Sequence, residues 1–464
     1  MQCAGISIDL KDIPVLDPNF IPFEAFTRAY LARARKPVNV AIKRNNGQIC
    51  LYETQICGGP EMRPADRLYM ERLVKFLLWQ KGGYEIYICG DEEIAGWLAQ
   101  QYEPGGLRQF DAQFMSRVFE MPFAVRQVSL EETPSPWETR QKLGGHLAGC
   151  RIGFDAGGSD RKVSAVIDGK SVYSEEIVWF PKVQSDPEYH YEHIVTAFKT
   201  AAAKMPRVDA VGVSSAGIYI DNQTKAASLF RQVPEALFKE KIKDIYIRAA
   251  CELGEDIPLA VANDGDVTAL AGAMSLEDDN ILGIAMGTSE AVGFVADGGA
   301  VTGWLNELAF APVDLQTEAA ADEWSGALGV GSSYFSQDAA IRLAGSAGID
   351  LDESLSLAEK LKEIQRLMDI GDPRAAAVFE TVGCYLGHTI PLYYRFYKMK
   401  HVLLLGRLTS DRGGELLVSA ANRVLASEYP EINEKVSLKL PDEKSRRVGQ
   451  SVAAASLPQI GQEA

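Results

Sequence analysis

The first 150 residues alternate between strand-like and helix-like patterns of hydrophobic and polar positions. Two short apolar segments flank Asn45-Asn46-Gly47, an arrangement that predicts a β-hairpin. Apolar residues then recur at helical spacing, and an apolar strand separates two such stretches. In chain order the segments are a hairpin over 38–52, a helix over 66–80, a strand over 84–89 and a helix through 94–98. This order predicts an α/β layer, and the region carries no chemical motif.

From residue 150 onward the pattern changes to strand–turn–strand units followed by helices. A strand over 151–155 runs into a glycine-rich turn, and a second strand over 163–167 leads through Asp168-Gly169 into a third. Further along come a strand at 208–213, a long helix near 235–253, a strand at 258–262, a strand–turn–strand unit over 281–296, helices over 336–400 and a strand over 402–406. The two strand–turn–strand units lie about 130 residues apart, which indicates two related half-domains.

Charge and length narrow the classes of protein that fit. The chain of 464 residues carries 47 Lys and Arg against 63 Asp and Glu, a formal net charge of −16. Its length predicts about two or three domains. The first 150 residues are close to neutral, and an acidic, proline-containing stretch over 131–136 marks a boundary near 130–150. An acidic surface repels phosphate backbones, which disfavours nucleic-acid binding and docking on an anionic membrane.

Cysteine usage and the absence of apolar runs bear on the compartment. Seven cysteines are scattered without a C-x-x-C pair, at positions 3, 50, 57, 89, 150, 251 and 384. Such spacing is typical of reduced thiols, and with five histidines it predicts no zinc cluster. The first fourteen residues include acidic side chains, unlike a signal peptide, and no stretch reaches about 18 uninterrupted apolar residues. We therefore expect a cytoplasmic protein with no membrane partner.

The turn Asp155-Ala156-Gly157-Gly158-Ser159 is the first candidate for chemistry. Its glycines let backbone N–H groups converge on a phosphate, and the hydroxyl of Ser159 adds a donor. Asp155, at the end of its strand, is placed to hold Mg²⁺ through water, because hard cations prefer oxygen ligands. An ordinary hairpin turn accounts for the same pattern, so the motif alone leaves both interpretations open.

Three further turns are candidates. A strand delivers Asn263-Asp264 to the start of a helix, where a carboxylate can act as general base or simply cap the helix. The turn at Gly287-Thr288 could close on other phosphates, and Gly406-Arg407 lies between a strand and a helix, whose N-terminus favours anions. Ordinary turns explain each of these motifs when it is taken alone.

Taken together, the order and spacing of the four motifs resemble the sugar kinase, Hsp70 and actin superfamily, and within it the ROK family of repressors, open reading frames and sugar kinases. The resemblance covers roughly residues 150–460. It implies an α/β fold in which two ribonuclease H-like lobes form an actin-like ATPase, with an additional N-terminal α/β region. The implied domains are an N-terminal region of unknown role over 1–145, a first lobe with the first phosphate motif over 150–270, and a second lobe with the second phosphate and adenosine motifs over 271–464.

On the nucleotide side, the resemblance implies ATP and Mg²⁺ as cofactors. Asp155 to Ser159 match the first phosphate motif, D-x-G-G-T, with Ser in place of Thr. The residues implied to contact the nucleotide are Asp155, Gly157, Gly158, Ser159, Gly287, Thr288, Gly406 and Arg407. Asp155 would also hold Mg²⁺ through water, and Arg407 replaces a glycine of the family's adenosine turn.

On the sugar side, the resemblance implies a small-molecule substrate and a homo-oligomer, first of all a dimer. Asp264 matches the catalytic base of the V-x-N-D-A segment, and Asn263 matches a sugar ligand. Ala216 and Gly217 lie in a segment that looks like the sugar-side loop. Glu307 matches the sugar-binding carboxylate of G-E-x-G-H.

Three further positions depart from the family pattern. Phe310 stands where the zinc-binding His is expected, and no cysteine lies between 251 and 384, so we expect no structural zinc. Ser332 stands near the position of a further sugar-binding Glu. Glu290 lies in the second phosphate turn, where a carboxylate would repel a phosphate unless a metal or base offsets it.

The leading prediction is an ATP-dependent carbohydrate kinase in which Asp264 takes the proton of a sugar hydroxyl during γ-phosphoryl transfer. The alternative is a catalytically degenerate ROK-like protein that binds a sugar or regulates without turnover. The departures favour this alternative, whereas retention of Asp155 and of the 263–264 pair argues against it. A repressor would need a basic N-terminal helix-turn-helix, which the near-neutral, strand-containing N-terminal region does not predict.

Overall fold

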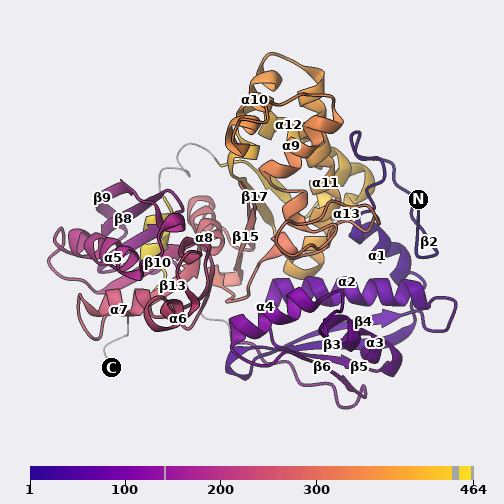
Figure 1. Cartoon of the computed structure of the whole chain (residues 1–464), viewed down its shortest axis with the longest axis horizontal. Coiled ribbons are helices and arrows are strands. Elements are labelled where there is room, and N and C mark those ends of the chain that lie inside the picture. Colours follow the sequence, from indigo (N-terminus) through magenta and orange to yellow (C-terminus); the bar gives the residue numbers. More distant parts are fainter. Residues whose placement is uncertain (140–142, 442–448, 461–464) are drawn as a thin grey trace. The chain divides into compact units, whose positions relative to one another are not determined.

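The computed structural model describes residues 1–139, 143–441 and 449–460 of a mixed α/β chain (Figure 1). The chain forms two compact units. The first, here called the N-terminal unit, combines residues 1–139 with 284–292 and 304–440. The second, the central unit, combines 140–283 with 293–303 and the segment from 441 onward. The three-part division expected from the sequence, 1–145, 150–270 and 271–464, stays a prediction.

In the N-terminal unit, the first 139 residues build a four-stranded sheet with the strand order β4-β3-β5-β6. The strands are β3 (Lys36–Lys43), β4 (Ile49–Ile56), β5 (Glu85–Cys89) and β6 (Ala124–Val128), and the helices are α1 (Phe23–Leu31), α2 (Arg63–Lys81), α3 (Glu92–Tyr102) and α4 (Gln109–Phe119). A short pair of strands, β1 (Gln2–Cys3) and β2 (Ile6–Ser7), precedes them. The predicted hairpin is confirmed as β3 and β4, and Asn46 and Gly47 take the positive φ values, 56° and 72°, that a tight connection requires. The predicted helices and strand are confirmed as α2, β5 and α3.

The central unit is built on a five-stranded sheet with the order β13-β10-β7-β8-β9. Its strands are β7 (Cys150–Ala156), β8 (Asp160–Ile167), β9 (Lys170–Val178), β10 (Ala210–Ser215) and β13 (Leu259–Asn263). β7, β10 and β13 run parallel, whereas β8 and β9 continue from β7 as an antiparallel meander. The predicted strands in this region are thereby confirmed.

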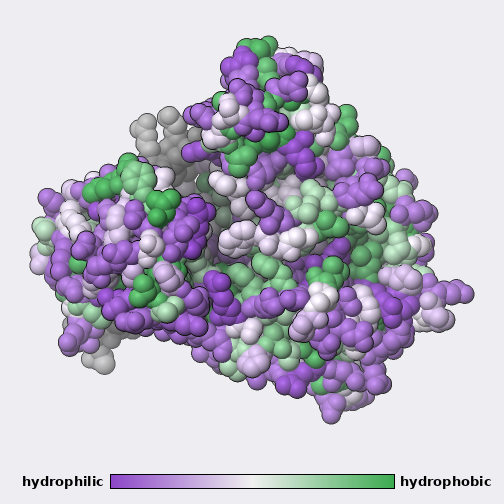
Figure 2. Space-filling view, viewed as in Figure 1, coloured by the Kyte–Doolittle hydropathy of each residue, from purple (hydrophilic) through white to green (hydrophobic). Residues whose placement is uncertain are grey.

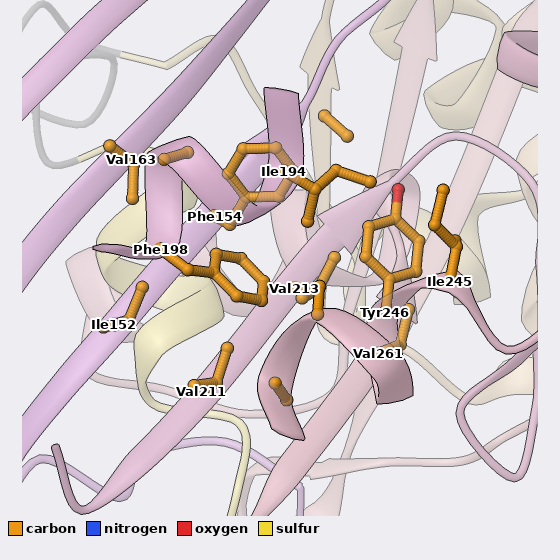
Figure 3. Packing of buried hydrophobic residues seen from close by; sticks show 14 of the residues in the cluster. Ile152, Phe154, Val163, Ile194, Phe198, Val211, Val213, Ile245, Tyr246 and Val261 are labelled. Atoms are coloured by element: carbon orange, nitrogen blue, oxygen red, sulfur yellow. The ribbon is translucent and has the colours of Figure 1, made fainter. Parts of the chain in front are cut away.

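One face of this sheet packs on helices α5 (Pro187–Ala202) and α7 (Ile245–Cys251) around a core of fully buried side chains (Figure 3). Phe154 of β7 meets Phe198 of α5 edge-on at 5.5 Å between ring centroids. The helix α15 (Gln450–Ala455) lies close against a glycine of β7. A Cβ atom at Gly153 would lie 1.6 Å from the carbonyl oxygen of Ser451. Glycine is therefore required in β7, because a larger residue would push α15 off the sheet.

The prediction of one long, continuous helix near 235–253 is wrong. The segment divides into α6 (Glu235–Leu237), a π-helical turn over Phe238–Ile242 and α7. The carbonyl of Lys243 accepts a hydrogen bond from the backbone N–H of Thr224 at 2.8 Å, on the small hairpin of β11 (Ile218–Ile220) and β12 (Gln223–Ala226). This tertiary bond takes a carbonyl that a continuous helix would use, so the helix breaks there.

A second five-stranded sheet has the order β16-β15-β14-β17-β18. The strands are β14 (Ile281–Met286), β15 (Glu290–Ala296), β16 (Ala300–Val301), β17 (His401–Leu405) and β18 (Ser437–Lys439). The helices of this part are α8 (Asp264–Leu276) in the central unit and, in the N-terminal unit, α9 (Gln337–Ser346), α10 (Leu357–Asp369), α11 (Pro373–Tyr397), α12 (Asp411–Glu428) and α13 (Pro430–Asn433). The helices predicted over 336–400 and the strand over 402–406 are confirmed.

Most of the face shown in Figure 2 is hydrophilic, in keeping with the formal net charge of −16. Among the residues that the structure describes, no helix combines the length and the apolar character needed to cross a membrane.

Candidate functional site

In the central unit, polar side chains gather where three parallel strands end at one edge of the sheet. Asp155 of β7 is level with Ser214 of β10, and Ser215 is level with Asn263 of β13. Ser214 donates its hydroxyl hydrogen to Oδ1 of Asp155 at 2.9 Å. Asp264 follows Asn263 directly and is the first residue of α8. Ligands bind beside the carboxyl ends of such strands in open α/β sheets, so this edge is the candidate site.

The environment of this edge perturbs both carboxyl groups. Asp155 is only 7% exposed, and this burial raises its pKa to about 6; the hydroxyl of Ser214 acts against the shift, and the charge of Asp264 adds to it. Burial also raises the pKa of Asp264, while the backbone N–H of Gly265 and the positive charge of Lys182 act in the opposite direction. Two carboxyl groups that are poorly solvated and close enough to interact suit proton transfer or the binding of a cation.

Asn263, rather than Asp264, caps α8. Its Oδ1 accepts a hydrogen bond from the backbone N–H of Gly265 at 2.7 Å, and its Nδ2 donates to the carbonyl of Gly217 at 2.7 Å. Both ends of the amide are thus engaged within the chain, one by the helix and one by the loop that contains Ala216 and Gly217. Asn263 provides the helix cap, and Oδ1 of Asp264, on the first turn of the helix, accepts from the same backbone N–H of Gly265 at 3.0 Å.

The glycine-rich turn over 157–159 is fastened by a residue from the end of β9. Trp179 donates its indole N–H to the carbonyl of Gly157 at 2.8 Å, and its backbone N–H donates to the carbonyl of Ser159 at 3.1 Å. Trp179 is fully buried, whereas Gly158 and Ser159 are exposed. Sequence reasoning missed Trp179, which lies outside the motif and carries no local signal of this contact.

In the N-terminal unit, two predicted turns lie against each other. Gly287 and Thr288 connect β14 to β15, and the carbonyl of Gly287 accepts from the backbone N–H of Gln337 at the start of α9, at 2.8 Å. Gly406 follows β17 with φ 94°, and a Cβ atom there would lie 2.4 Å from the carbonyl oxygen of Met286. Only glycine allows this close passage. The next residue, Arg407, is exposed.

Glu307 lies in a segment that the N-terminal region holds in place. The backbone N–H of Glu307 donates to the carbonyl of Trp79 at 3.0 Å, and that of Asn306 donates to the carbonyl of Gln80 at 3.0 Å. Phe310, at the position of the family's zinc-binding His, stacks on Trp79 with 4.3 Å between ring centroids. Phe110 and Phe114 of α4 complete this aromatic cluster.

A second contact holds the same segment further along. The fully buried carboxylate of Asp314 accepts from the backbone N–H of Ile21 at 2.9 Å and from the hydroxyl of Tyr334 at 2.5 Å. The backbone N–H of Leu315 donates to the carbonyl of Ile21 at 3.0 Å. Sequence reasoning assigned no role to the N-terminal region, and the structure shows that it organises the segment that carries Glu307.

Glu290 points into the interior of the N-terminal unit. Its side chain is 4% exposed, Tyr393 donates to Oε1 at 3.1 Å, and a Cβ atom at Gly331 would lie 2.0 Å from Oε2. Burial raises the pKa of Glu290 to about 8, and the charge of Glu307 adds to the shift. The side chain is therefore mostly protonated at neutral pH, so the repulsion of phosphate considered from the sequence is not expected.

Ser332 donates to Oδ1 of Asp322 at 2.9 Å.

The structure thus collects the sequence-predicted residues into two groups, one in each unit. The central unit holds Asp155, Gly157, Gly158, Ser159, Ala216, Gly217, Asn263 and Asp264, and the N-terminal unit holds Gly287, Thr288, Glu307, Gly406 and Arg407. In the described part of the chain, no cluster of three or more His, Cys, Asp or Glu residues could hold a metal ion by itself.

Comparisons with known proteins bear on the fold. No family model and no curated protein matches the chain. A ROK hexokinase from Thermus thermophilus superposes with a TM-score of 0.52 at 19% identity, over 66% of this chain and 97% of that one. A ROK-family transcriptional regulator, a homologue of the E. coli MLC protein, does so with a TM-score of 0.51 at 16% identity, over 67% of this chain and 79% of that one.

The chain therefore has the two-lobed, actin-like α/β fold of ROK proteins, and the fold predicted from the motifs is confirmed. At such identities the likeness concerns the fold alone. Because a kinase and a regulator share it, the fold does not choose between turnover and sensing, and that choice depends on the chemistry of the site.

Proposed function

We propose that the chain is an ATP-dependent carbohydrate kinase of the ROK type, which transfers the γ-phosphoryl group of ATP to a sugar hydroxyl. The observation that carries the proposal is the pair of poorly solvated carboxyl groups, Asp155 and Asp264, at the carboxyl edge of the central sheet. A protein that only binds a sugar needs no general base, whereas phosphoryl transfer to a hydroxyl does.

Asp264 takes the proton from the attacking hydroxyl. Its raised pKa makes it a stronger base than an ordinary aspartate, and the charge of Lys182 acts against the shift. Asn263 caps α8 and so places Asp264 on the first turn of the helix, where Oδ1 of Asp264 also accepts from the backbone N–H of Gly265 at 3.0 Å. The γ-phosphoryl group passes to the sugar oxygen as the proton passes to the carboxylate.

The residues present fit a hydrated Mg²⁺. Burial raises the pKa of both Asp155 and Asp264, so a bound cation would favour their charged forms, and Mg²⁺ in phosphoryl-transfer sites is bound by one or two carboxylates plus substrate phosphates. Bound there, the ion would neutralise charge on the phosphates of ATP. Asp155 would hold it, and Ser214 fixes the orientation of Asp155. The backbone N–H groups of the 157–159 turn would bind phosphate oxygens.

A second candidate function is sugar sensing without turnover. The fold shared with a ROK transcriptional regulator favours it, as does Ser332, which stands near the position of a sugar-binding Glu and donates to Asp322. In this case the sugar would bind and raise the stability of the chain, but ATP would not be consumed.

The test is a panel of hexoses and amino sugars with MgATP, in which ADP release and the thermal unfolding of the full chain are both measured. We expect at least one sugar to support ADP release, and Asp264→Asn to lower kcat by about 10³-fold with little change in sugar binding. Asp256→Asn, at an exposed position in the same unit, is the matched control and keeps full activity. An unchanged rate in D264N contradicts the kinase proposal, and sugars that stabilise the chain without any turnover support the sensor.

A further inference from the structure

A lysine outside every motif lies on the glycine-rich turn of the central unit. Lys182 belongs to a short 3₁₀ turn, Pro181–Val183, that follows β9. A Cβ atom at Gly158 would lie 2.8 Å from both Cε and Nζ of Lys182. The end of the Lys182 side chain therefore lies directly against Gly158, which is exposed.

The backbone that carries Lys182 is held on both sides. Upstream, Trp179 is bonded to the carbonyls of Gly157 and Ser159, so β9 leaves the sheet at a defined place relative to the turn. Downstream, the guanidinium of Arg231 donates to the carbonyl of Lys182 at 3.2 Å. Because the backbone at this position is held beside the turn, the ammonium group stays within reach of a ligand on the turn, which lowers the cost of ordering it there.

Lys182 differs from two other lysines of the central unit, which form ordinary surface ion pairs. Lys162 and Lys199 of the same unit pair with carboxylates, Lys162 with Asp160 and Glu176 and Lys199 with Glu252. In the described part of the chain no such pair holds Lys182. Its charge is instead felt by Asp264, whose pKa it lowers. The ammonium group thus acts on both the glycine-rich turn and the carboxylate assigned as the base.

We propose that Lys182 binds the γ-phosphoryl group of a nucleoside triphosphate and stabilises it during transfer. This inference rests on the proposed kinase function and adds a catalytic residue to it. In the loose transition state of phosphoryl transfer, charge spreads over the three equatorial oxygens, and a lysine serves as a compact positive charge beside them. The side chain of Lys182 lies against the turn at 157–159, and its charge reaches the base Asp264, which are the two groups that the transferred phosphoryl group would meet.

The experiment compares ATP with ADP, because ADP lacks the phosphoryl group that Lys182 is proposed to touch. Dissociation constants for MgATP and MgADP are measured by calorimetry on the full chain, for the wild type, Lys182→Met, Lys182→Arg and the control Lys170→Met at an exposed position of β9. We expect K182M to weaken ATP binding by about 10-fold or more, to leave ADP binding within about 3-fold, and to lower kcat by about 10²–10³-fold. K182R retains most of the ATP binding, and K170M behaves as the wild type.

A structural role for Lys182 predicts a different result. If the side chain only packs on Gly158, K182M weakens ATP and ADP binding equally or lowers the unfolding temperature, and either result overturns the inference. The pH profile gives a second readout: without the ammonium group the pKa of Asp264 rises further, so the acidic limb of kcat/KM moves to higher pH in K182M but not in K170M.

The outcome also separates this inference from the kinase proposal. A wild-type chain that binds ATP more tightly than ADP but phosphorylates no sugar contradicts the kinase, and the loss of that preference in K182M still supports Lys182 as a γ-phosphoryl ligand. Turnover in the wild type together with unchanged ATP binding and kcat in K182M overturns the role of Lys182 and leaves the kinase standing. A wild type that binds no nucleotide overturns both.

Discussion

Replacing Asp155 with asparagine should make the central unit more stable at pH 8 while it removes the proposed activity. Asp155 is 7% exposed, and its pKa is about 6 in the folded chain against an ordinary value of 3.8. Because the folded pKa is raised, the folded state holds this proton more tightly than the unfolded state does. Ionisation of Asp155 therefore costs stability as the pH rises from about 4 to about 6, and the full cost remains above that range.

The magnitude follows from the same two values. A shift from 3.8 to about 6 corresponds to about 3 kcal/mol at pH 8, at about 1.4 kcal/mol per pKa unit, and to about 0.5 kcal/mol at pH 4. The amide of the D155N variant would keep an acceptor for the Ser214 hydroxyl and would carry no charge. The advantage of D155N over the wild type should therefore grow by about 2–3 kcal/mol between pH 4 and pH 8. A carboxylate whose ionisation lowers the stability of the folded chain by this much is typical of a functional position.

The assay is urea unfolding of the full chain at pH 4, 6 and 8, followed by hydrogen exchange of the β7 and β10 amides, which reports on the central unit by itself. Asp209→Asn is the matched control. Asp209 accepts from the backbone N–H of Cys150 at 2.7 Å and pairs with Arg207, and these contacts hold its pKa below the usual range. D209N should thus lose stability at pH 8 and approach the wild type at low pH. The reasoning fails if D155N is less stable than the wild type at pH 8, or if its advantage does not shrink as the pH falls.

Two further predictions concern the N-terminal unit. Glu290→Gln imitates the protonated acid, whereas the folded wild type must keep a proton on a group with a pKa of about 8. The stability of E290Q relative to the wild type should therefore rise between pH 5 and pH 8, by up to about 1.4 kcal/mol per pH unit. Thermal unfolding at the two pH values measures this change, and a pH-independent difference would contradict it. Phe310→Ala removes the ring that stacks on Trp79, which should cost about 2–3 kcal/mol of stability and raise the sugar KM about 10-fold without changing ADP binding. An unchanged sugar KM would show that the aromatic cluster does not position Glu307.

Much of the fold follows from local patterns in the sequence. Asn46 and Gly47 can take positive φ, so they specify the β3–β4 hairpin wherever it lies in the molecule. The alternation of β7 and β8 around a glycine-rich turn is equally local. The helix predicted near 235–253 failed for the opposite reason, because the bond from Thr224 to the Lys243 carbonyl comes from another part of the chain and is invisible to a periodicity argument.

The candidate site divides in the same way. Asp155 and Asp264 could be found from sequence, since each ends a strand and the carboxyl ends of parallel strands share an edge. Trp179 and Lys182 could not, because they stand about 20 residues from the turn they contact and reach it only through the path of β9. Phe310 was noted as a missing zinc ligand, but its partner Trp79 lies more than 200 residues away in the chain.

By itself, the sequence determined which residues of this protein can do chemistry and in what order the strands present them, because turn glycines, strand periodicity and residue types are local properties. Only the tertiary structure decided the state of those residues. Burial is a collective result of packing, and it raises the pKa of Asp155 and of Asp264 and keeps the proton on Glu290. The tertiary structure also shows that the N-terminal region, a stretch without a motif, supports Glu307. The carbonyls of Trp79 and Gln80 accept backbone hydrogen bonds from the segment of Glu307 only once these distant parts of the chain have come together.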